Sequence, residues 1–553
     1  MAPQIEKDEV LLVPSAVIVP DELRLDVGSV PSGMITLRGK PMLERIAAAY
    51  TDLDVTRVVA ADTGRERIEQ YVSRSEYDWT VVDVAGTESL ADTVEMALSA
   101  FPAADLRNTG LYVNFADTLV SPVRTVASGD YVPYRVEDRT YRWTAFEIKN
   151  GDIEDITPKY ERASSGPRPV FVGQFGISSA DALLTALRNA DSDYIPRFYA
   201  GLRAYLSERT YDLWEPNTWI DVGHLDTYHM AKKQFLNTRE FNELHVDSGK
   251  NVITKRSNDA ETLISEINWY NQVPSALQPY LPRIYDWSTD GEKPFVQMEY
   301  IGYLSLSDLQ LYGSHGQHLW NRIFYRLMQM LAEFREFTVT DTEKICDALK
   351  SMYVDKTRRR LNTLRDDERF EPFFGRDEVV VNGASHPSLG EFLGQLDSIV
   401  EEESLLCRGE FTIIHGDLCL PNILYDPRNQ IVKLIDPRGA FGSFTVYGDP
   451  RYDLAKLRHS FVGHYEHLIN GQFDAFRLGD RELSYDVHVT DEQQRREARF
   501  DTVLEEEVQD SLSQIELIEA LLFLSMVPLH SDSYERQLCM LSQGIEKITP
   551  FVR

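Results

Sequence analysis

The chain has 553 residues and a formal net charge of −31 at pH 7. That length corresponds to about three or four average domains. Hydrophobic residues make up 43% of the chain, which is enough to fill the cores of several domains. The negative charge argues against a nucleic-acid partner, because phosphate binding needs a basic stripe and we find none in the sequence.

Apolar segments and cysteines bear on where the protein resides. Residues 10–20 are apolar but lack a basic flank and include a proline, which favours a buried strand over a signal peptide. Residues 520–529 are too few to span a bilayer. The four cysteines form no C-x-x-C pair, so we expect reduced core thiols and no metal cluster. We therefore expect a cytoplasmic protein without a membrane span.

The first part of the chain alternates short apolar strands with helical stretches. Strands are predicted at 16–19, 57–60, 80–84 and 111–115, and helices at 42–50, 67–71 and 90–101. This order is typical of a parallel α/β sheet, in which ligands bind at the carboxyl ends of the strands. Asp117 directly follows a predicted strand and is a candidate metal ligand. A second acid, Asp221, lies in the segment Trp-Ile-Asp-Val-Gly-His at 219–224.

These elements resemble the sugar-nucleotidyltransferase family, whose members join a sugar phosphate to a nucleoside triphosphate. The resemblance covers roughly the first 235 residues and includes Asp117, the segment at 219–224 and Gly-Lys-Pro-Met-Leu at 39–43. A predicted hairpin at 141–156 and a strand at 170–177 also follow the family order. The resemblance implies that Asp117 and Asp221 bind a catalytic Mg²⁺ and that Lys159 contacts the sugar phosphate. It also implies a Rossmann-like, GT-A-like nucleotidyltransferase domain at residues 1–238.

The sequence departs from that family where the triphosphate is held. Residues 19–25 replace the glycine-rich loop whose backbone amides cradle the phosphates. Asp21 and Glu22 would repel phosphate there, and only Arg24 remains as a contact. The family's lysine after Pro31 is Ser32, and each lost contact costs on the order of a few kcal/mol of transition-state stabilisation. Two interpretations stay open: active nucleotidyl transfer, or a degenerate domain that binds a sugar, a nucleotide or only its neighbour.

The second part of the chain follows without a flexible linker. Residues 232–242 predict a helix that runs into a short connection, so we expect two packed domains with a boundary at 238/239. A strand at 251–255 ends at Lys255, and a helical segment containing Glu266 comes next. A further apolar strand leads into Met298, Glu299 and Tyr300.

The segment at 411–439 carries three polar residues at spacings that suit phosphoryl transfer. An apolar run at 411–414 predicts a buried strand, after which Gly416 lets the chain turn and directs the carboxylate of Asp417 into a cleft. A carboxylate there can accept the proton of an attacking hydroxyl. A predicted hairpin at 422–435 then brings Asn422 and Asp436 together. Their oxygens are hard ligands suited to Mg²⁺ with bound phosphates.

This segment resembles the aminoglycoside phosphotransferase and choline kinase superfamily, the small-molecule branch of the protein-kinase fold. The match includes His-Gly-Asp at 415–417, Asn422, Ile-Asp at 435–436 and Gly-Asp-Pro-Arg-Tyr-Asp-Leu-Ala at 448–455. The resemblance implies that Asp417 is the catalytic base, that Asn422 and Asp436 bind Mg²⁺, and that His415 is a structural member of the loop. Asp453 opens a predicted helix, so a capping role for it stays as open as a catalytic one.

The same resemblance extends to the nucleotide. Lys255 would hold the ATP phosphates, Glu266 would orient Lys255, and residues 298–300 lie where the family binds adenine. The loop at 245–250, which would cover the nucleotide, contains one glycine.

A dense basic segment at 353–360 stands out in this acidic chain. Lys356 and Arg360 share one predicted helix face and are candidates for holding an anionic substrate. The alternative is an ordinary solvated helix face. Arg438, just after the metal aspartate, is a candidate for contacting the acceptor group.

We therefore expect an α/β protein in which a nucleotidyltransferase-like sheet precedes a bilobal α+β kinase-like domain at 239–553, with its N-lobe at about 239–300 and its C-lobe at about 301–553. The expected activity is ATP- and Mg²⁺-dependent phosphorylation of a hydroxyl on a sugar, polyol or amino alcohol, in the synthesis of capsule or other surface-polysaccharide precursors. One alternative is a bifunctional kinase and nucleotidyltransferase that makes a nucleoside-diphosphate-activated product, and another is a ligand-binding pseudoenzyme scaffold. A protein kinase is disfavoured, because no activation segment separates Asp436 from Asp449.

Overall fold

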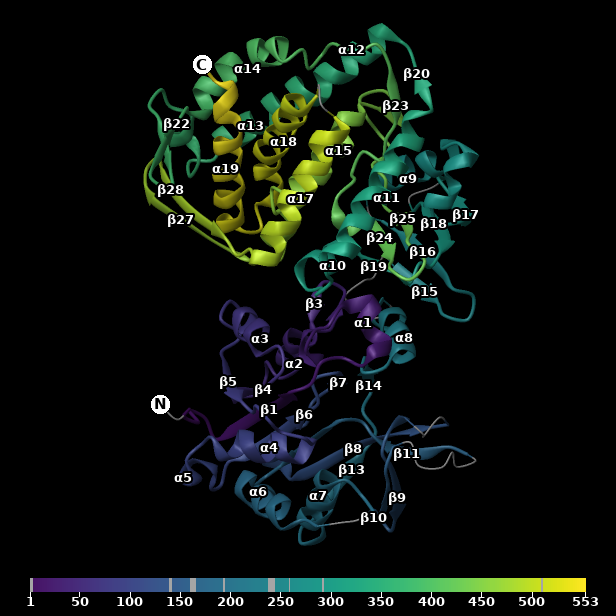
Figure 1. The fold of residues 1–553 in the computed structure, drawn as a ribbon, viewed down its shortest axis with the longest axis vertical. Helices are drawn as coiled ribbons and strands as arrows, with labels where there is room; N and C mark the ends of the chain where they lie inside the picture. The colour runs from purple at the N-terminus through teal and green to yellow at the C-terminus, as the bar shows by residue number, and fades with distance from the viewer. Residues whose placement is uncertain are drawn as a thin grey trace. The chain divides into compact units, whose positions relative to one another are not determined.

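The computed structural model describes residues 3–138, 142–159, 166–191, 194–236, 244–257, 259–290, 293–508 and 511–553. The chain divides into two compact units, Met1–Phe235 with Tyr312–Ser314, and Leu236–Leu311 with His315–Arg553. The predicted boundary at 238/239 lies outside the described residues. Both units combine helices and strands (Figure 1), which confirms the α/β class.

A ten-stranded mixed sheet forms the centre of the first unit, in the order β10-β9-β11-β8-β12-β6-β1-β4-β5 with β13 beside β8. The strands are β1 (Glu9–Ser15), β4 (Val55–Ala61), β5 (Trp79–Asp83), β6 (Gly110–Asn114), β8 (Asp130–Glu137), β9 (Ala145–Lys149), β10 (Asp152–Thr157), β11 (Arg168–Phe171), β12 (Gln174–Ile177) and β13 (Tyr211–Trp214). β1 pairs in parallel with β4 and β6, and β4 pairs in parallel with β5. β12 is antiparallel to β6, and β9 and β10 form the predicted hairpin. The parallel prediction is therefore correct for the last four strands of this path, β6-β1-β4-β5, and incomplete for the sheet.

The predicted strand at 16–19 is wrong. The first strand is β1, which uses the preceding apolar run and pairs with neighbours on both sides. Beyond it, Ile18 makes only an isolated bridge to Pro31. A run buried on both faces is apolar throughout, so periodicity alone cannot decide which of two adjacent apolar runs enters the sheet.

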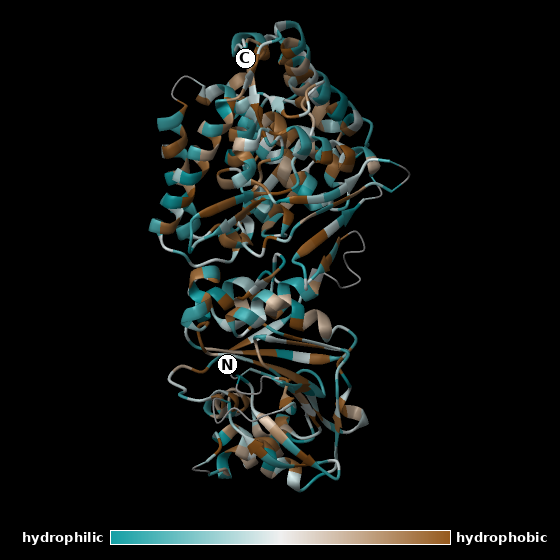
Figure 2. Ribbon diagram, turned by 90° about the vertical axis from the view of Figure 1, so that its right-hand side faces the viewer, coloured by the Kyte–Doolittle hydropathy of each residue, from teal (hydrophilic) through white to brown (hydrophobic). Residues whose placement is uncertain are grey.

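Successive residues of β1 point to opposite faces of the sheet. Val10 and Leu12 join a core with helices α4 (Leu90–Ser99), α6 (Ala180–Asn189) and α7 (Arg197–Ser207). Leu11 and Val13 are buried on the other face. Figure 1 shows α2 (Met42–Ala49) and α3 (Arg65–Val72) across the sheet from α4 and α6, and Figure 2 shows hydrophobic residues along the strands between them. The remaining elements of this unit are α1 (Asp21–Val27), β2 (Thr36–Leu37), β3 (Lys40–Pro41), α5 (Ala103–Leu106), β7 (Thr118–Ser121), β14 (Thr218–Asp221) and α8 (Leu225–Leu236).

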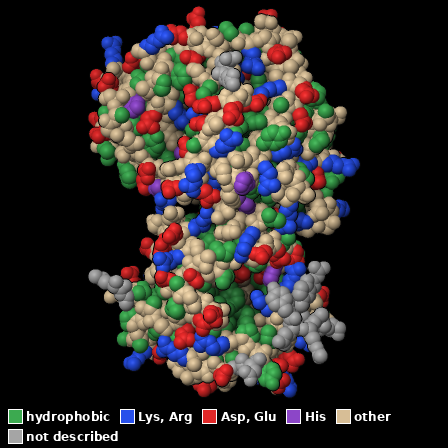
Figure 3. All heavy atoms as spheres, viewed as in Figure 1, with side chains coloured by type: hydrophobic (Ala, Val, Ile, Leu, Met, Phe, Trp, Pro, Cys, Tyr) green, Lys and Arg blue, Asp and Glu red, His purple; other side chains and the backbone are tan. Residues whose placement is uncertain are grey.

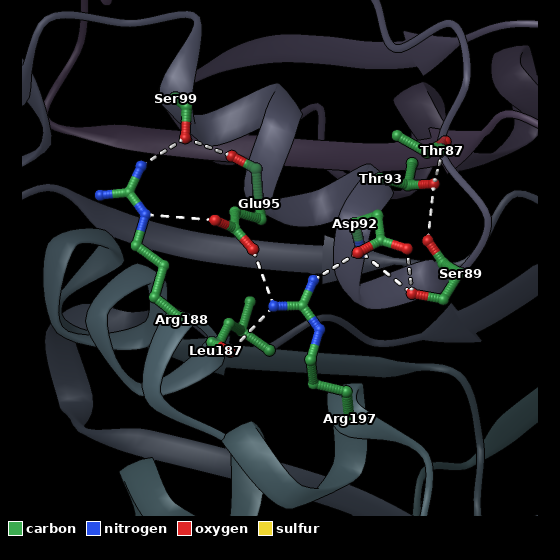
Figure 4. Close-up of polar contacts among 9 residues, drawn as sticks. All are labelled: Thr87, Ser89, Asp92, Thr93, Glu95, Ser99, Leu187, Arg188 and Arg197. Carbon is green, nitrogen blue, oxygen red and sulfur yellow. Dashed lines mark hydrogen bonds and ion pairs between the residues drawn. The ribbon is translucent and has the colours of Figure 1, made fainter. Parts of the chain in front are cut away.

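Two arginines connect α4 to the helices beside it (Figure 4). Arg197 donates to Glu95 at 2.8 Å and to Asp92 at 2.5 Å. Arg188 donates to Glu95 at 3.3 Å and to Ser99 at 2.8 Å. Such partly exposed pairs contribute about 0.2–1 kcal/mol each. The apolar core beneath them therefore provides the larger share of the packing energy.

The second unit begins with a small antiparallel sheet, β15 (Leu244–Asp247), β16 (Val252–Arg256), β18 (Phe295–Glu299) and β17 (Ile284–Ser288) in spatial order. Helix α9 (Ala260–Gln272) packs on this sheet. Their shared core consists of Leu263, Ile267, Val296 and Met298. The elements expected for the N-lobe follow in the predicted order: β16 with Lys255, α9 with Glu266, and then β18.

The rest of the second unit is largely helical. Its helices are α10 (Leu306–Leu311), α11 (Gln317–Arg335), α12 (Thr342–Lys350), α13 (Lys356–Arg365), α14 (Leu389–Glu402), α15 (Pro450–Phe461), α16 (Tyr465–Ile469), α17 (Asp491–Glu507), α18 (Leu512–Met526) and α19 (Tyr534–Ile548). Its strands are β19 (Leu304–Ser305), β20 (Thr338–Val339), β21 (Val379–Val381), β22 (Ala384–His386), β23 (Phe411–Ile413), β24 (Ile423–Asp426), β25 (Ile431–Leu434), β26 (Tyr447–Gly448), β27 (Phe473–Gly479) and β28 (Glu482–Val487). On the face drawn in Figure 3, acidic and basic side chains are interspersed.

Two sequence-based expectations change here. The stretch Leu512–His530 is 19 residues long and apolar enough to cross a membrane by length and composition, so the run at 520–529, which was judged too short to span a bilayer, is part of a longer apolar stretch. Because 67% of its most apolar window is buried in the protein, α18 packs as a core helix. Cys419 and Cys539 are buried as expected, but Cys346 and Cys407 are exposed, so the prediction of four core thiols is wrong for two of them.

Candidate active site

The segment at 411–439 folds as a strand, a turn and a hairpin, as predicted. β23 leads to a turn at Gly416, whose φ of +78° is a conformation that glycine adopts readily. β24 and β25 then pair antiparallel, with Ile423 opposite Leu434. The hairpin ends at Asp436, which has a φ of +57°. The predicted base and both predicted metal ligands therefore lie on one continuous supersecondary unit.

Asp417 is held by two side chains. Asn422 Nδ2 donates to the backbone oxygen of Asp417 at 2.9 Å and to its Oδ2 at 3.2 Å. Lys456 Nζ lies 2.9 Å from Oδ1 of the same carboxylate. Burial acts to raise the pKa of Asp417, but Lys456, His415 and Arg438 together outweigh it and lower that pKa below its ordinary value. The Asp417 carboxylate is therefore ionised and fixed in direction.

The turn before Asp417 is anchored by Asp453. The backbone N–H groups of His415 and Gly416 donate to its two carboxylate oxygens at 2.7 and 2.9 Å. Helix α15 begins earlier, at Pro450, and is capped by Asp449, whose Oδ1 accepts from the Arg451 N–H at 3.1 Å. The capping role considered for Asp453 is therefore wrong, and this buried carboxylate fixes the backbone of the catalytic turn instead.

His415 has a structural position within the same turn. The N–H of Asp417 donates to His415 Nδ1 at 3.3 Å, and His415 Nε2 lies 3.0 Å from the carbonyl oxygen of Ile435. Burial lowers the pKa of His415. A neutral imidazole with its proton on Nε2 satisfies both contacts and ties the turn to the end of the hairpin.

The predicted lysine–glutamate pair is present, and Lys255 also contacts Asp436, the predicted metal ligand. Lys255 Nζ lies 2.7 Å from Glu266 Oε2 and 2.7 Å from Asp436 Oδ1. Burial acts to lower the pKa of Lys255, but Asp436 and Glu266 outweigh it and raise that pKa above its ordinary value. The ammonium is therefore charged and lies beside the carboxylate that the sequence assigned to the metal.

The loop after Asp436 runs directly against α9. A Cβ atom placed on Gly439 would lie 2.1 Å from the carbonyl oxygen of Ser265, and Gly439 has a φ of +68°. Ser265 precedes Glu266 in that helix. Backbone contact therefore joins the helix that carries the glutamate to the loop that carries the metal aspartate.

The predicted adenine segment forms the end of β18. The Met298 side chain is buried in the core between the sheet and α9. The N–H of Glu299 donates to Arg283 O at 2.8 Å, and that of Tyr300 donates to Asn251 O at 2.9 Å. Both N–H groups already donate to backbone oxygens within the protein. An adenine ring bound at this edge would therefore have to bond to carbonyl oxygens or to the segment that follows.

The residues near Asp436 suit a magnesium ion. Asn422 uses its amide nitrogen for Asp417, which leaves its oxygen for a cation. The Asp436 side chain is 47% exposed and contributes carboxylate oxygens. Among the described residues no group of three or more His, Cys, Asp or Glu side chains could hold a metal. One amide and one carboxylate match the sparse protein coordination of Mg²⁺, which keeps waters and takes phosphate oxygens.

The three basic substrate candidates also converge on this site. Arg438 Nη1 donates to the hydroxyl of Tyr452 at 3.1 Å, and Lys356 Nζ lies 5.5 Å from the centre of the Tyr452 ring. Arg360 is half-buried on the same helix as Lys356 and donates to Ser525 O at 3.3 Å. Lys356 is 7% exposed, so the alternative of a solvated helix face is wrong for it.

In the first unit, the two predicted metal acids lie close together. Gly223 lies so near Asp117 that a Cβ there would be 2.5 Å from Asp117 Oδ2. Burial and the Asp221 carboxylate raise the pKa of Asp117 to about 6. Asp221 accepts from Thr227 Oγ1 at 2.7 Å and from Trp143 Nε1 at 3.1 Å. The exposed Lys159 is near enough to Asp117 to oppose its pKa shift.

The segment that replaces the glycine-rich loop folds into helix α1, and its charged side chains form ion pairs and hydrogen bonds within the protein. Arg24 Nη1 pairs with Asp21 Oδ1 at 2.8 Å, and Arg24 Nε donates to Val19 O at 3.2 Å. Glu22 Oε1 lies 3.2 Å from His224 Nδ1 and accepts from the Leu225 N–H at 3.3 Å, at the start of α8. A glutamate thus lies beside the loop that follows Asp221, and the arginine expected to contact phosphate is already paired.

Residues 237–484 match the model of the phosphotransferase enzyme family. The chain contains a phosphotransferase-family domain. The matched residues include Lys255, Glu266, Asp417, Asn422, Asp436 and all of α15. A search of curated proteins finds no match to the chain.

Solved structures with similarity to the chain include two nucleotidyltransferases and one phosphotransferase. UDP-glucose pyrophosphorylase from Acinetobacter baumanii is 14% identical, with 42% of this chain and 95% of that chain covered and a TM-score of 0.35. CTP:phosphocholine cytidylyltransferase from Streptococcus pneumoniae is 10% identical, with 41% and 98% covered and a TM-score of 0.33. A thermostable mutant of an aminoglycoside phosphotransferase is 13% identical, with 55% and 86% covered and a TM-score of 0.34.

Four residues at these sites were missed by sequence reasoning: Lys456, Tyr452, Trp143 and Thr227. Lys456 directly follows the matched segment at 448–455, but nothing local in the sequence pairs it with Asp417. Tyr452 lies inside that segment at a position the pattern leaves free. Nothing local in the sequence points to Trp143, because its bond to Asp221 spans 78 positions.

Proposed function

We propose that this protein transfers the γ-phosphate of ATP to a hydroxyl group of a small molecule. The observation that carries the proposal is the convergence of an ionised, oriented carboxylate, Asp417, with the Asn422–Asp436 oxygen pair and the Lys255 ammonium. Positioning and charge stabilisation account for most catalysis of phosphoryl transfer, and these residues supply both.

Each residue has a distinct task in this proposal. Asp417 accepts a hydrogen bond from the acceptor hydroxyl and takes its proton as the oxygen attacks phosphorus. Lys255 binds phosphate oxygens of the nucleotide, and Glu266 holds Lys255 in position. Asn422 and Asp436 would hold Mg²⁺, which when bound neutralises charge on the phosphates.

The test is an ATP-consumption screen of sugars, polyols, amino alcohols and their charged derivatives, with products identified by mass. Turnover should fall by about 10²–10⁴ in Asp417→Asn while the fold is kept, and Asp436→Asn should lose at least as much. Asp377→Asn, which changes a carboxylate that is 77% exposed, is the matched control and should retain wild-type activity. A folded Asp417→Asn protein with full activity would exclude this mechanism.

A second candidate function belongs to the first unit. The closely placed Asp117 and Asp221 favour a metal site of the kind used in nucleotidyl transfer, which would make the protein bifunctional. The paired Arg24 and the position of Glu22 argue against a triphosphate there. We propose that this unit binds a ligand with weak or no turnover, and a scaffold without catalysis in either unit is the remaining alternative.

The cellular setting is part of the same proposal. A kinase product that is then activated as a nucleoside diphosphate derivative suits the synthesis of surface-polysaccharide precursors. That chemistry, together with the absence of a C-x-x-C pair, supports a cytoplasmic location.

A further inference from the structure

Three cations surround one tyrosine next to the catalytic turn. Arg438 donates to the Tyr452 hydroxyl, and Lys356 lies over the same side chain. Arg360 lies one helical turn beyond Lys356 in α13 and is close enough to lower its pKa. Tyr452 is itself buried, with 3% of its surface exposed. These four side chains form a single positively charged group, which we call the Tyr452 cluster.

No carboxylate of the described residues forms an ion pair with the Tyr452 cluster, and the nearest acid that acts on it is Asp417, whose pKa Arg438 helps to lower. Arg358, on the same helix, pairs with Asp397 at 2.8 Å, whereas no ion pair of the described chain includes Lys356, Arg360 or Arg438. This is unexpected in a chain with 88 acidic and 57 basic residues. A buried ammonium is normally paired, because removing it from water is costly.

The charges of the cluster act on one another. Burial lowers the pKa of Lys356 to about 8, and Arg438 and Arg360 act in the same direction. Burial acts to raise the pKa of Tyr452, but Lys356, Arg438 and Lys456 outweigh it and lower that pKa below its ordinary value. An anion bound here would relieve this mutual repulsion.

The cluster is adjacent to the base. A Cβ on Gly416 would lie 3.0 Å from the Cβ of Arg438, so Arg438 packs on the turn that presents Asp417. Lys456, one turn along α15 from Tyr452, contacts the Asp417 carboxylate. A small molecule held by the cluster would therefore have its other groups next to Asp417.

We propose that the phosphoryl acceptor is itself an anion, a small alcohol carrying a phosphate or carboxylate group that Lys356, Arg360 and Arg438 bind while its hydroxyl faces Asp417. This rests on the proposed function and narrows its substrate class. The acceptor oxygen forms the new bond to the γ-phosphorus, the bond from that phosphorus to the bridging oxygen breaks, ADP leaves, and the hydroxyl proton passes to Asp417. Amino alcohols are disfavoured, because their ammonium would meet three like charges.

The first test measures binding without turnover. Thermal stabilisation of the full chain is measured with glycerol 3-phosphate, with glycerate and with glycerol as the neutral parent. We expect the two anions, and not glycerol, to stabilise the protein. Asp417→Asn should keep this effect, whereas the double change Lys356→Met with Arg438→Ala should lose it. A response unaffected by that double change, or lost equally in Lys255→Met at the nucleotide site, would overturn the proposal.

The second test uses turnover with matched pairs of acceptors, each anionic alcohol beside its neutral parent. Loss of one charged hydrogen bond should raise KM for the anionic member by about 10- to 100-fold in Arg438→Ala or Lys356→Met. The KM for ATP should not change. Arg358→Ala, which alters the neighbouring paired arginine, is the control and should leave both constants unchanged.

The outcomes separate this inference from the proposed function. Phosphorylation of only neutral or cationic alcohols would overturn the anionic acceptor and leave the kinase intact. Anion binding that depends on the cluster, without transfer to any acceptor, would support the anion site and count against the kinase. Preference for the phosphate or for the carboxylate member identifies the anionic group.

Discussion

Lys456 Nζ lies 2.9 Å from Asp417 Oδ1, and the helix that carries this lysine also carries Asp453, three residues earlier. One face of α15 therefore contacts both the backbone and the carboxylate of the turn at 415–417. Asp453 accepts hydrogen bonds from the backbone N–H groups of His415 and Gly416, and Lys456 pairs with the Asp417 carboxylate. Each is buried, so neither contact is readily replaced by water.

Removal of the Lys456 charge should slow the chemical step. In Lys456→Met the Asp417 carboxylate loses its buried partner and its fixed direction, so we expect kcat to fall by about 10- to 100-fold. The KM for ATP should change little, because Lys456 contacts the base and not the proposed phosphate site. Lys456→Arg should recover part of the loss, and Lys344→Met, at a lysine that is 66% exposed, should be neutral. An unchanged kcat in Lys456→Met would show that this contact does not position the base.

Replacement of Lys255 should affect turnover more than nucleotide binding. Lys255→Met removes a phosphate contact and leaves Glu266 and Asp436 without the ammonium that bridges them. We expect a modest loss of ATP affinity and a much larger loss of kcat, because the contact is strongest in the transition state. Lys344→Met, at the exposed lysine of α12, is the matched control. Wild-type turnover in the Lys255 variant would mean that the ATP phosphates bind elsewhere.

The Tyr452 cluster predicts a pH dependence for the acceptor. Lys356 is cationic below its pKa of about 8, so binding of an anionic acceptor should weaken as the pH rises through that value. The effect should enter kcat/KM through KM, and Lys356→Arg should move it to higher pH. The groups that face Lys356 are Tyr452, Arg438 and Arg360. A neutral acceptor should show no such fall, and an equal fall for both kinds of acceptor would contradict the assignment.

The first unit should not be needed for phosphoryl transfer. With Asp117 and Asp221 both changed to Ala in a folded protein, we expect the kinase activity to remain, because neither residue belongs to the proposed ATP site. Pyrophosphate release from each of the four common nucleoside triphosphates, with the kinase product as co-substrate, should be weak or absent. Asp212→Ala, at a carboxylate that is 78% exposed, is the control. Robust release that disappears in Asp117→Ala would establish a bifunctional enzyme.

Much of the second unit could be predicted because its key elements follow one another closely along the sequence. The hairpin β24–β25 and the strand–helix order of Lys255 and Glu266 depend on short segments whose turn residues and apolar runs are visible in the sequence. The pairing of Lys456 with Asp417 spans 39 positions and has no local signature. The burial of Lys356 was equally invisible, because a helix face crowded with arginines normally faces water.

In the first unit, the sequence could not show which of two adjacent apolar runs forms the first strand. Both 10–13 and 16–19 are apolar, and only the pairing of β1 with β4 and β6 decides between them. Asp117 was found because it follows a predicted strand, and Asp221 because it lies in the segment at 219–224 that resembles the nucleotidyltransferase family. The contact of Glu22 with the start of α8 joins residues about two hundred positions apart, and sequence order does not reveal it.

Gly439 lets the two lobes of the second unit approach each other more closely than any other residue at this position would allow. Since even a methyl group at this position would overlap the Ser265 carbonyl, the loop of Asp436 and helix α9 already touch through their backbones. Closure over a nucleotide can therefore proceed only by sliding or rotating about this contact, with the glycine as its pivot. A side chain here would push the two backbones apart and disturb the contact between Lys255 and Asp436.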